Sequence, residues 1–457
     1  MGGRAHLGAI IIKKTKTILI SIGFGVLIAA TSHGTEKRDP QHGIYHSVPL
    51  KVNEHDLLNT ADEYEDMMSR RGLRHIDPQL ESWFAGIGQR LTPDPSDEYQ
   101  HYRFYLLRDP SANAFALPDG QIYVHTGLLA RLENEAQLAA LLAHEINHVA
   151  GHHSLVAYRS QQSKAMIGVL VGMAAQEVGT VGAAGGALLI NSGLSASVFG
   201  YSRSLEKEAD IRGYDLLLNA GYDVQQIPNL YDILGQDYEG LQPRIRGKWS
   251  THPELQIRAE YMADLVAKAP VDALAGLEIG DPDFRKRIRP LALTVVDDYI
   301  LDDYPKTALE LARTLVEEDP NDPNALVAVG NACIALGMRP GYSTDHVLSN
   351  KKKRKAAKNR ARLTRAELRA QAEASPDAMA NLEKNAGAAE QAFLAALELD
   401  PNRAEAFRGL GKAYLNRKQY KQSAAAFMKY LKMNPEASDR PVIIDQLHEI
   451  MKKIKSS

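Results

Sequence analysis

Apolar and polar residues change their spacing several times along the first half of the chain. Between residues 53 and 91 apolar positions recur at helical spacing and are divided by Asp77-Pro78, so the pattern predicts two helices. Arg103-Phe-Tyr-Leu-Leu107, which is apolar and aromatic after its first residue, predicts a strand. Pro118-Asp119-Gly120 lies between two further apolar stretches and predicts a hairpin. We expect a small sheet whose edge strand either holds an extended peptide or serves only as scaffold.

Residues 138–153 carry the most informative helical pattern. Its apolar positions would bury one flank: Leu138, Leu141, Leu142 and Val149. His144 and His148 are four residues apart, so they share a face and can direct two imidazoles at one metal ion. Glu145 lies about 100° round the helix and suits the role of general base in an H-E-x-x-H zinc site. The alternative is a chance match within an ordinary helix.

A further helical segment covers residues 201–221. Glu206 and Asp210 are four residues apart and share a face. Such a pair alone is usually a solvated helix face. Beside His144 and His148, Glu206 is placed to complete a two-histidine, one-carboxylate zinc site with an open position for water. Asp210 is then placed to receive the second ring N–H of a ligand histidine.

Residues 165–199, between these segments, are rich in glycine and alanine. Three interpretations compete: a buried hairpin of helices, a mobile cover over the active site, and a segment that dips into a membrane. Gln176 and Glu177 make a membrane span costly. Small residues serve both close helix packing and hinges, so the sequence does not decide between the first two.

After Pro270 the pattern changes to helices punctuated by Asp-Pro and Asn-Pro. The last of them match the positions of a tetratricopeptide repeat: Phe407, Leu410, Gly411, Tyr414, Tyr420, Ser423, Phe427, Tyr430 and Pro435. Earlier segments match less completely, so we predict repeats over 289–437 and a capping helix over 438–457. They form a short solenoid with a groove for a partner, or hairpins that only brace the preceding domain.

An insertion over residues 337–384 interrupts these repeats. Lys351–Arg369 within it is strongly basic. Such a run is most often a solvated helix face or a loop. In an exported protein it would also suit peripheral contact with an anionic lipid surface.

Composition narrows the class of protein. The chain has 457 residues, of which 44% are apolar and 24% charged, as in a globular protein of two or three domains. A net charge of −2 gives no basic excess for nucleic acid. Cys333 is the single cysteine, which excludes an intrachain disulfide and a cysteine-based zinc cluster. A metal site must therefore use histidines and carboxylates.

Residues 1–32 place basic residues before the apolar run Ile18–Ala30, and small residues follow. This order predicts a secretory signal peptide, with an uncleaved anchor as the alternative. The run is short for a membrane span, which takes about 20 residues. An exported chain without disulfides fits a bacterial periplasm.

Together these motifs resemble the M48 family of zinc metalloendopeptidases over residues 50–268. The resemblance rests on Asn113–Gly120, on His144–Val149 with His153, and on Ser202–Asp210. It implies one Zn2+ per chain. The residues that match the family's ligands are His144, His148 and Glu206, with Glu145 as the catalytic base and Asp210 as a supporting residue.

The stretch Ser250-Thr-His252-Pro253, followed by Arg258, resembles a further family element in which a His-Pro loop approaches the metal. The resemblance implies that His252 either closes the fourth coordination position in a resting form or donates a hydrogen bond to the tetrahedral intermediate. Otherwise it is a surface loop residue. Asn147 and His152 depart from the residues that family members commonly carry.

The resemblance implies a mainly α (α+β) fold: a gluzincin-type metallopeptidase domain with a small β-sheet, followed by an α-helical repeat solenoid. Members with a signal peptide and repeats resemble the periplasmic β-barrel assembly-enhancing proteases. This implies protein or peptide substrates among misfolded or stalled envelope proteins, and contact with the outer-membrane assembly machinery through the repeats. The rival from another class is a periplasmic assembly chaperone with a mostly closed metal site, and a third is a membrane-embedded peptidase.

Overall fold

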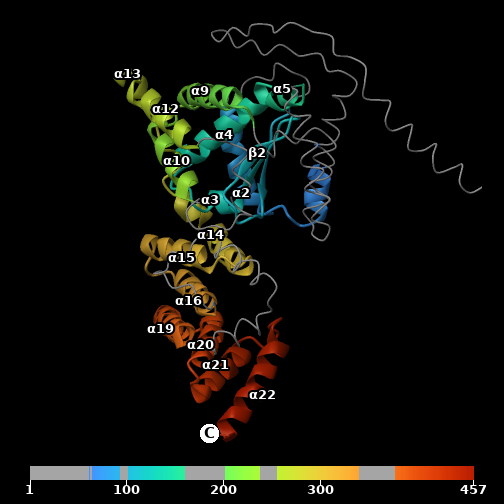
Figure 1. The fold of residues 1–457 in the computed structure, drawn as a ribbon, viewed down its shortest axis with the longest axis vertical. Helices are drawn as coiled ribbons and strands as arrows, with labels where there is room; N and C mark the ends of the chain where they lie inside the picture. The colour runs from blue at the N-terminus through green and yellow to red at the C-terminus, as the bar shows by residue number, and fades with distance from the viewer. Residues whose placement is uncertain are drawn as a thin grey trace, which may run out of the picture. The chain divides into compact units, whose positions relative to one another are not determined.

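The computed structural model describes residues 61, 64–92, 101–159, 201–236, 255–338 and 376–456 (Figure 1). All of them belong to one compact unit, His46–Ser457. The predictions for residues 1–32, for residues 165–199, for His252 and for Lys351–Arg369 lie outside the described residues. Within the described ranges, no helix combines the length and apolar character that a bilayer span requires.

The described part is mainly helical with a three-stranded sheet, which confirms the predicted fold class. The strands are β1 (Arg103–Leu107), β2 (Ala114–Ala116) and β3 (Gln121–His125), in the order β1-β3-β2. β2 and β3 form the predicted antiparallel hairpin, and Gly120 in its turn has a φ of 96°, a conformation that favours glycine. β1 pairs with β3 in parallel, which the sequence did not predict. β2 is therefore an edge strand.

Helix α4 (Glu135–Ala150) lies at the centre of the sheet-containing part. The side chain of Asn134 begins it by accepting a hydrogen bond from the backbone N–H of Gln137. Every residue of α4 except His144 is buried, because α2 (Pro78–Leu91), the sheet and α9 (Arg203–Asn219) all pack on it. A Cβ at Gly213 of α9 would lie 3.3 Å from the backbone nitrogen of His144. The two helices thus meet closely at the predicted metal ligand.

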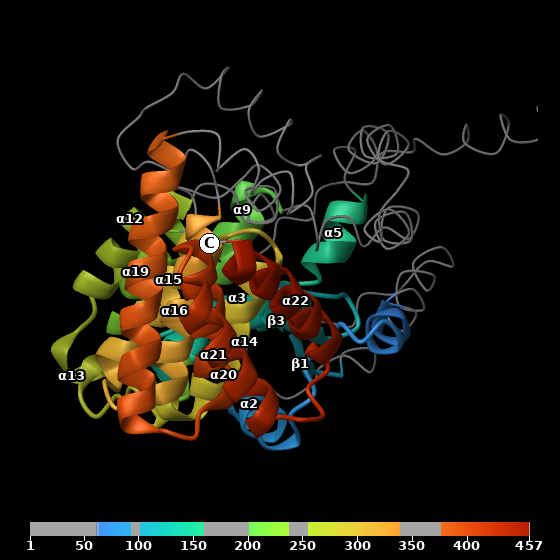
Figure 2. The same cartoon turned by 90° about the horizontal axis from the view of Figure 1, so that it is seen from below.

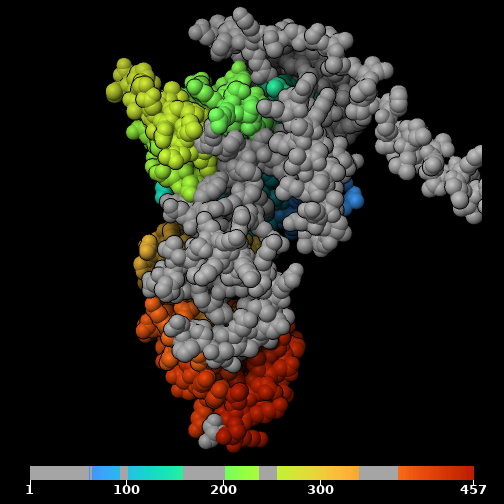
Figure 3. All heavy atoms as spheres, in the orientation of Figure 1, coloured from blue at the N-terminus to red at the C-terminus, as the bar shows by residue number. Residues whose placement is uncertain are grey.

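Shorter and flanking elements complete this part: α3 (Thr126–Leu129), α5 (His153–Arg159), η1 (Val224–Gln226), α10 (Ile227–Gln236), α12 (Leu255–Ala267) and α13 (Val271–Leu274). α10 packs on α4 and α12, and α12 contacts α9. The outer faces of α9 and α12 adjoin on the molecular surface (Figure 3). This packing brings side chains of α10 and α12 behind the α4–α9 crossing.

The described C-terminal helices are α14 (Phe284–Leu301), α15 (Pro305–Glu318), α16 (Pro323–Gly337), α19 (Pro376–Leu399), α20 (Ala404–Asn416), α21 (Tyr420–Met433) and α22 (Arg440–Ser456). Neighbours in this order pack on one another (Figures 1 and 2). The ring of Phe393 fills the space where Gly330 of α16 and Gly409 of α20 lack side chains. Phe427 packs in the same way against Gly411.

Helix α14 is fixed to the sheet-containing part by polar contacts. Arg108, just after β1, donates two hydrogen bonds to Asp298, of 2.8 and 3.1 Å. Arg131 donates to the Tyr299 hydroxyl at 2.6 Å. Arg285 donates to two backbone carbonyls between α3 and α4. The first C-terminal helix therefore contacts the segment that leads into α4.

Candidate metal centre

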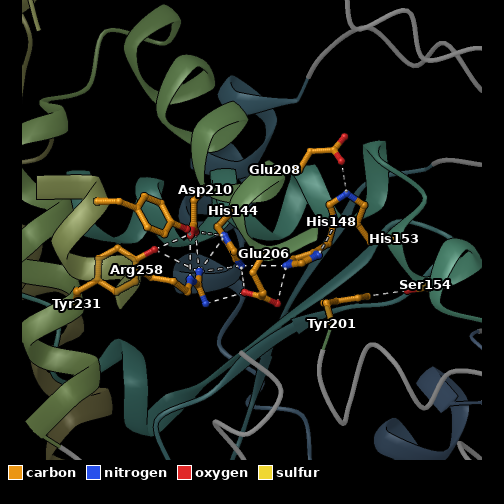
Figure 4. A network of polar contacts seen from close by, with 11 residues as sticks. His144, His148, His153, Ser154, Tyr201, Glu206, Glu208, Asp210, Tyr231 and Arg258 are labelled. Carbon is orange, nitrogen blue, oxygen red and sulfur yellow. Dashed lines mark hydrogen bonds and ion pairs between the residues drawn. The ribbon is translucent and has the colours of Figure 1, made fainter. Parts of the chain in front are cut away.

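Three side chains from two helices converge: His144 and His148 from α4, and Glu206 from the first turn of α9 (Figure 4). The Nε2 atoms of the two histidines lie 2.9 Å apart. The Glu206 carboxylate oxygens lie 3.5 Å from Nε2 of His144 and 3.6 Å from Nε2 of His148. Among the residues that the structure describes, no other group of three histidine, cysteine or acidic side chains is placed to hold a metal ion.

This donor set fits zinc. Two imidazole nitrogens and one carboxylate oxygen are common zinc ligands, and bonds of about 2.0–2.2 Å in a tetrahedral site keep ligand atoms about 3.4 Å apart. The observed separations of 2.9, 3.5 and 3.6 Å lie on both sides of that value. Three protein ligands leave one tetrahedral position open, as in catalytic zinc sites.

Asp210 supports His144 from the side away from the cluster. Asp210 lies on α9 one helical turn after Glu206, and its Oδ1 is 2.8 Å from Nδ1 of His144. A proton on Nδ1 leaves Nε2 unprotonated and directed at the cluster. Asp210 also accepts hydrogen bonds from the hydroxyls of Tyr231, at 2.9 Å, and Tyr261. The sequence predicted this contact of Asp210 with a histidine but neither tyrosine.

Arg258 of α12 contacts both carboxylates of the site. It donates two hydrogen bonds to Asp210, of 2.8 and 2.6 Å. Its Nη1 lies 2.6 Å from a carboxylate oxygen of Glu206. Only 5% of Arg258 is exposed, so these contacts are formed away from solvent and are screened little by salt.

The electrostatics of the protein groups in the site follow from these contacts. Burial and the charge of Arg258 lower the pKa of His144, but hydrogen bonds to Asp210 and Glu206 outweigh them and raise it to about 9. Burial raises the pKa of Asp210, but Arg258 and His144 bring it well below its ordinary value. Without a metal ion, both ring nitrogens of His144 therefore carry a proton at neutral pH, and a metal ion that binds Nε2 must displace the proton there.

His148 is restrained by different residues. Its Nδ1 lies 2.8 Å from Nδ1 of His153, the first residue of α5. Its ring stacks on Tyr201, with centroids 4.0 Å apart and planes 16° from parallel. The Tyr201 hydroxyl lies 2.9 Å from Oγ of Ser154. These three residues lie on the side of the cluster away from Arg258 (Figure 4).

Glu145 follows His144 on α4 and is fully buried. Its role as base and that of His252 remain predictions. The family resemblance placed Arg258 in a further element without giving it a role, and it did not single out Tyr231 or Tyr261. These residues lie 48, 21 and 51 positions from Asp210. No local spacing relates such distant positions.

A helix with two histidines one turn apart, crossed by a second helix that brings a glutamate, defines a metallopeptidase-type centre. The chain belongs to peptidase family M48, whose profile matches residues 78–266. The matched range includes His144, His148 and Glu206.

Known proteins with similar sequences include other metalloproteases. The metalloprotease YcaL of Escherichia coli is 30% identical over 245 residues, which are 50% of this chain and 90% of that protein. The beta-barrel assembly-enhancing protease of Escherichia coli is 29% identical over 212 residues, covering 43% of this chain and 42% of the relative. A Vibrio cholerae protein that is provisionally given the same name is 34% identical over 188 residues. The match covers 39% of this chain and 37% of that protein. The chain thus spans well under half of the length of the latter two relatives.

Proposed function

We propose that this protein is a zinc-dependent metalloendopeptidase in which His144, His148 and Glu206 hold one Zn2+. The convergence of their ligand atoms within 4.8 Å of one another carries the proposal. Membership of family M48 supports it, as do the names of the relatives, which call them proteases or metalloproteases.

Zinc held by His144, His148 and Glu206 would supply Lewis acidity toward a peptide carbonyl and an attacking water molecule. Glu145 takes the proton from the attacking water and passes it to the leaving amine. Asp210 holds the Nδ1 proton of His144, so that Nε2 remains a ligand. Arg258 places a positive charge against both carboxylates and lowers the pKa of Asp210.

Zinc analysis and casein cleavage by the purified full chain test the proposal. Glu206→Gln should lose the bound zinc and the cleavage, because a neutral amide is a poor zinc ligand. Glu260→Gln serves as the matched control, since Glu260 is exposed on α12. A Glu206→Gln variant that kept one zinc per chain and cleaved casein would contradict the ligand assignment.

We further propose that the enzyme works in the bacterial periplasm on misfolded or stalled envelope proteins. The N-terminal pattern over residues 1–32 and the names of the beta-barrel assembly-enhancing relatives support this. In this proposal residues 289–437 are tetratricopeptide repeats that bind a client or the outer-membrane assembly machinery. The successive packing of α14 to α22 fits such repeats.

Two cellular measurements test this second proposal. Fractionation of cells should place the chain in the periplasm or on its membranes. Cells that carry Glu145→Gln should accumulate a stalled outer-membrane protein that the wild type removes. A Glu145→Gln strain that behaves as wild type would favour the assembly chaperone instead.

A further inference from the structure

We infer that His153 is a positioning residue that fixes the orientation of the zinc ligand His148. The inference rests on the proposed function, because it concerns a ring whose Nε2 is a metal ligand. It extends that function to a residue outside the ligand set.

The contact between the two rings decides their proton positions. Their Nδ1 atoms lie 2.8 Å apart, and only 1% of His148 and 0% of His153 are exposed. When Nε2 of His148 is a ligand, the ring proton is on Nδ1, so Nδ1 donates and His153 accepts. His153 then carries its own proton on Nε2, which lies 3.8 Å from a carboxylate oxygen of Glu208. His153 thus does for His148 what Asp210 does for His144.

The turn between α4 and α5 is shaped around the ring of His153. A Cβ at Gly151 would lie 2.4 Å from Nε2 and 2.6 Å from Cδ2 of His153. Gly151 has φ −78° and ψ 0°, which any residue adopts, so the glycine is needed for space and not for its backbone conformation. A Cβ there would also lie 2.9 Å from the carbonyl oxygen of Asn147, but its two shortest contacts are with the His153 ring. His152 has a φ of 50°, a strained value for a residue other than glycine. This strained backbone at His152 turns the chain so that His153 packs against His148 near the end of α4.

The next residue of α5 adds a second restraint on His148. Oγ of Ser154 lies 2.9 Å from the hydroxyl of Tyr201, whose ring stacks on His148 at 4.0 Å. The first turn of α5 therefore holds His148 at its edge through His153 and at its face through Tyr201 (Figure 4). Rotation of the imidazole away from the metal would break both contacts.

The zinc dissociation constant of the full chain, measured by competition with a chelator, tests the inference. His153→Leu removes the acceptor, and we expect zinc affinity to fall about 10- to 100-fold. His153→Asn can place an oxygen near the position of Nδ1, so it should retain most of the affinity. Gly151→Ala should also weaken binding, because the new methyl group displaces the ring. Gly86→Ala is its control, since a Cβ at Gly86 meets nothing within 4 Å.

Two further readouts separate positioning from a purely structural role. The visible spectrum of the Co2+-loaded protein reports ligand geometry, and we expect it to change in His153→Leu and not in His153→Asn. Urea unfolding of the metal-free variants shows whether each one folds. If His153→Leu does not fold, the affinities of His153→Asn and Gly151→Ala decide, with the same expectations.

The outcomes distinguish this inference from the proposed function. If Glu206→Gln loses zinc while folded His153→Leu binds it as tightly as wild type, the positioning role is wrong and the enzyme assignment stands. If His153→Asn weakens binding as much as His153→Leu, the hydrogen bond is not what matters and the inference fails. If Glu206→Gln keeps the wild-type affinity, the proposed function fails and this inference fails with it.

Discussion

Replacing Arg258 by methionine removes the guanidinium that contacts both carboxylates of the metal centre. Methionine keeps a side chain of similar length but offers no hydrogen-bond donor. The change leaves Asp210 without two hydrogen bonds of 2.8 and 2.6 Å, and Glu206 without a contact of 2.6 Å. Both acids are almost fully buried, at 4% and 1% exposed.

The expected loss follows from this burial. Removing one partner of a buried ion pair costs about 3–5 kcal/mol of unfolding free energy. Protonated His144 still faces Asp210 in the metal-free protein, so we expect about 4 kcal/mol, within that range. Zinc should reduce the loss, because it compensates the charge of Glu206 and binds only the folded state.

Urea unfolding of the wild type and Arg258→Met, each with a chelator and with excess zinc, measures both effects. Arg70→Met is the control, because Arg70 and Asp66 form an exposed pair at 2.6 Å with 79% and 67% of their side chains exposed. Exposed pairs contribute about 0–1 kcal/mol. The reasoning is refuted if Arg258→Met loses no more than this control, or if zinc does not reduce its loss.

Three further predictions concern the catalytic base, the pH dependence of stability and the packing of Gly127. Glu145→Gln should keep its zinc and lose at least about 100-fold in casein turnover, the usual contribution of a general base; wild-type turnover would exclude Glu145 from that role. The unfolding free energy of the metal-free protein should fall by about 3 kcal/mol as pH rises from 6.5 to above 9. The pKa of His144 is raised from 6.5 to about 9 on folding, so its contribution is complete below 6.5 and absent above 9. Urea unfolding across this range should show a slope that His144→Gln lacks, and equal slopes would contradict the assignment. Gly127→Ala should destabilise the fold by about 1–3 kcal/mol or more, because its Cβ would lie 1.9 Å from the carbonyl oxygen of Pro110. Thermal unfolding beside Gly86→Ala measures this, and equal midpoints would show that the chain relaxes without cost.

The sequence predicted the parts of the site that depend on local periodicity. The helical period places His144 and His148 on one face, and the structure brings their Nε2 atoms to 2.9 Å. The same period places Glu206 and Asp210 on one face of α9, and both contact His144. The turn Pro118-Asp119-Gly120 likewise specified the β2–β3 hairpin. The histidine pair, the carboxylate pair and the hairpin each involve residues close in sequence. The approach of Glu206 to the two histidines was expected from the ligand set of a zinc site.

The remaining parts depend on tertiary packing. Arg258 reaches Asp210 only because α12 packs behind the α4–α9 crossing. The parallel pairing of β1 with β3 joins strands that a third strand separates in sequence. His153 belongs to the family motif, yet its contact with His148 depends on the backbone of Gly151 and His152 in a turn that spacing alone does not specify.

Anomalous diffraction at the zinc edge, from crystals of the full chain grown with zinc, tests the ligand assignment most directly. We predict one anomalous peak per chain, about 2.0–2.2 Å from Nε2 of His144, Nε2 of His148 and a carboxylate oxygen of Glu206. A peak that excludes Glu206, or zinc bound only elsewhere in the molecule, would contradict the account.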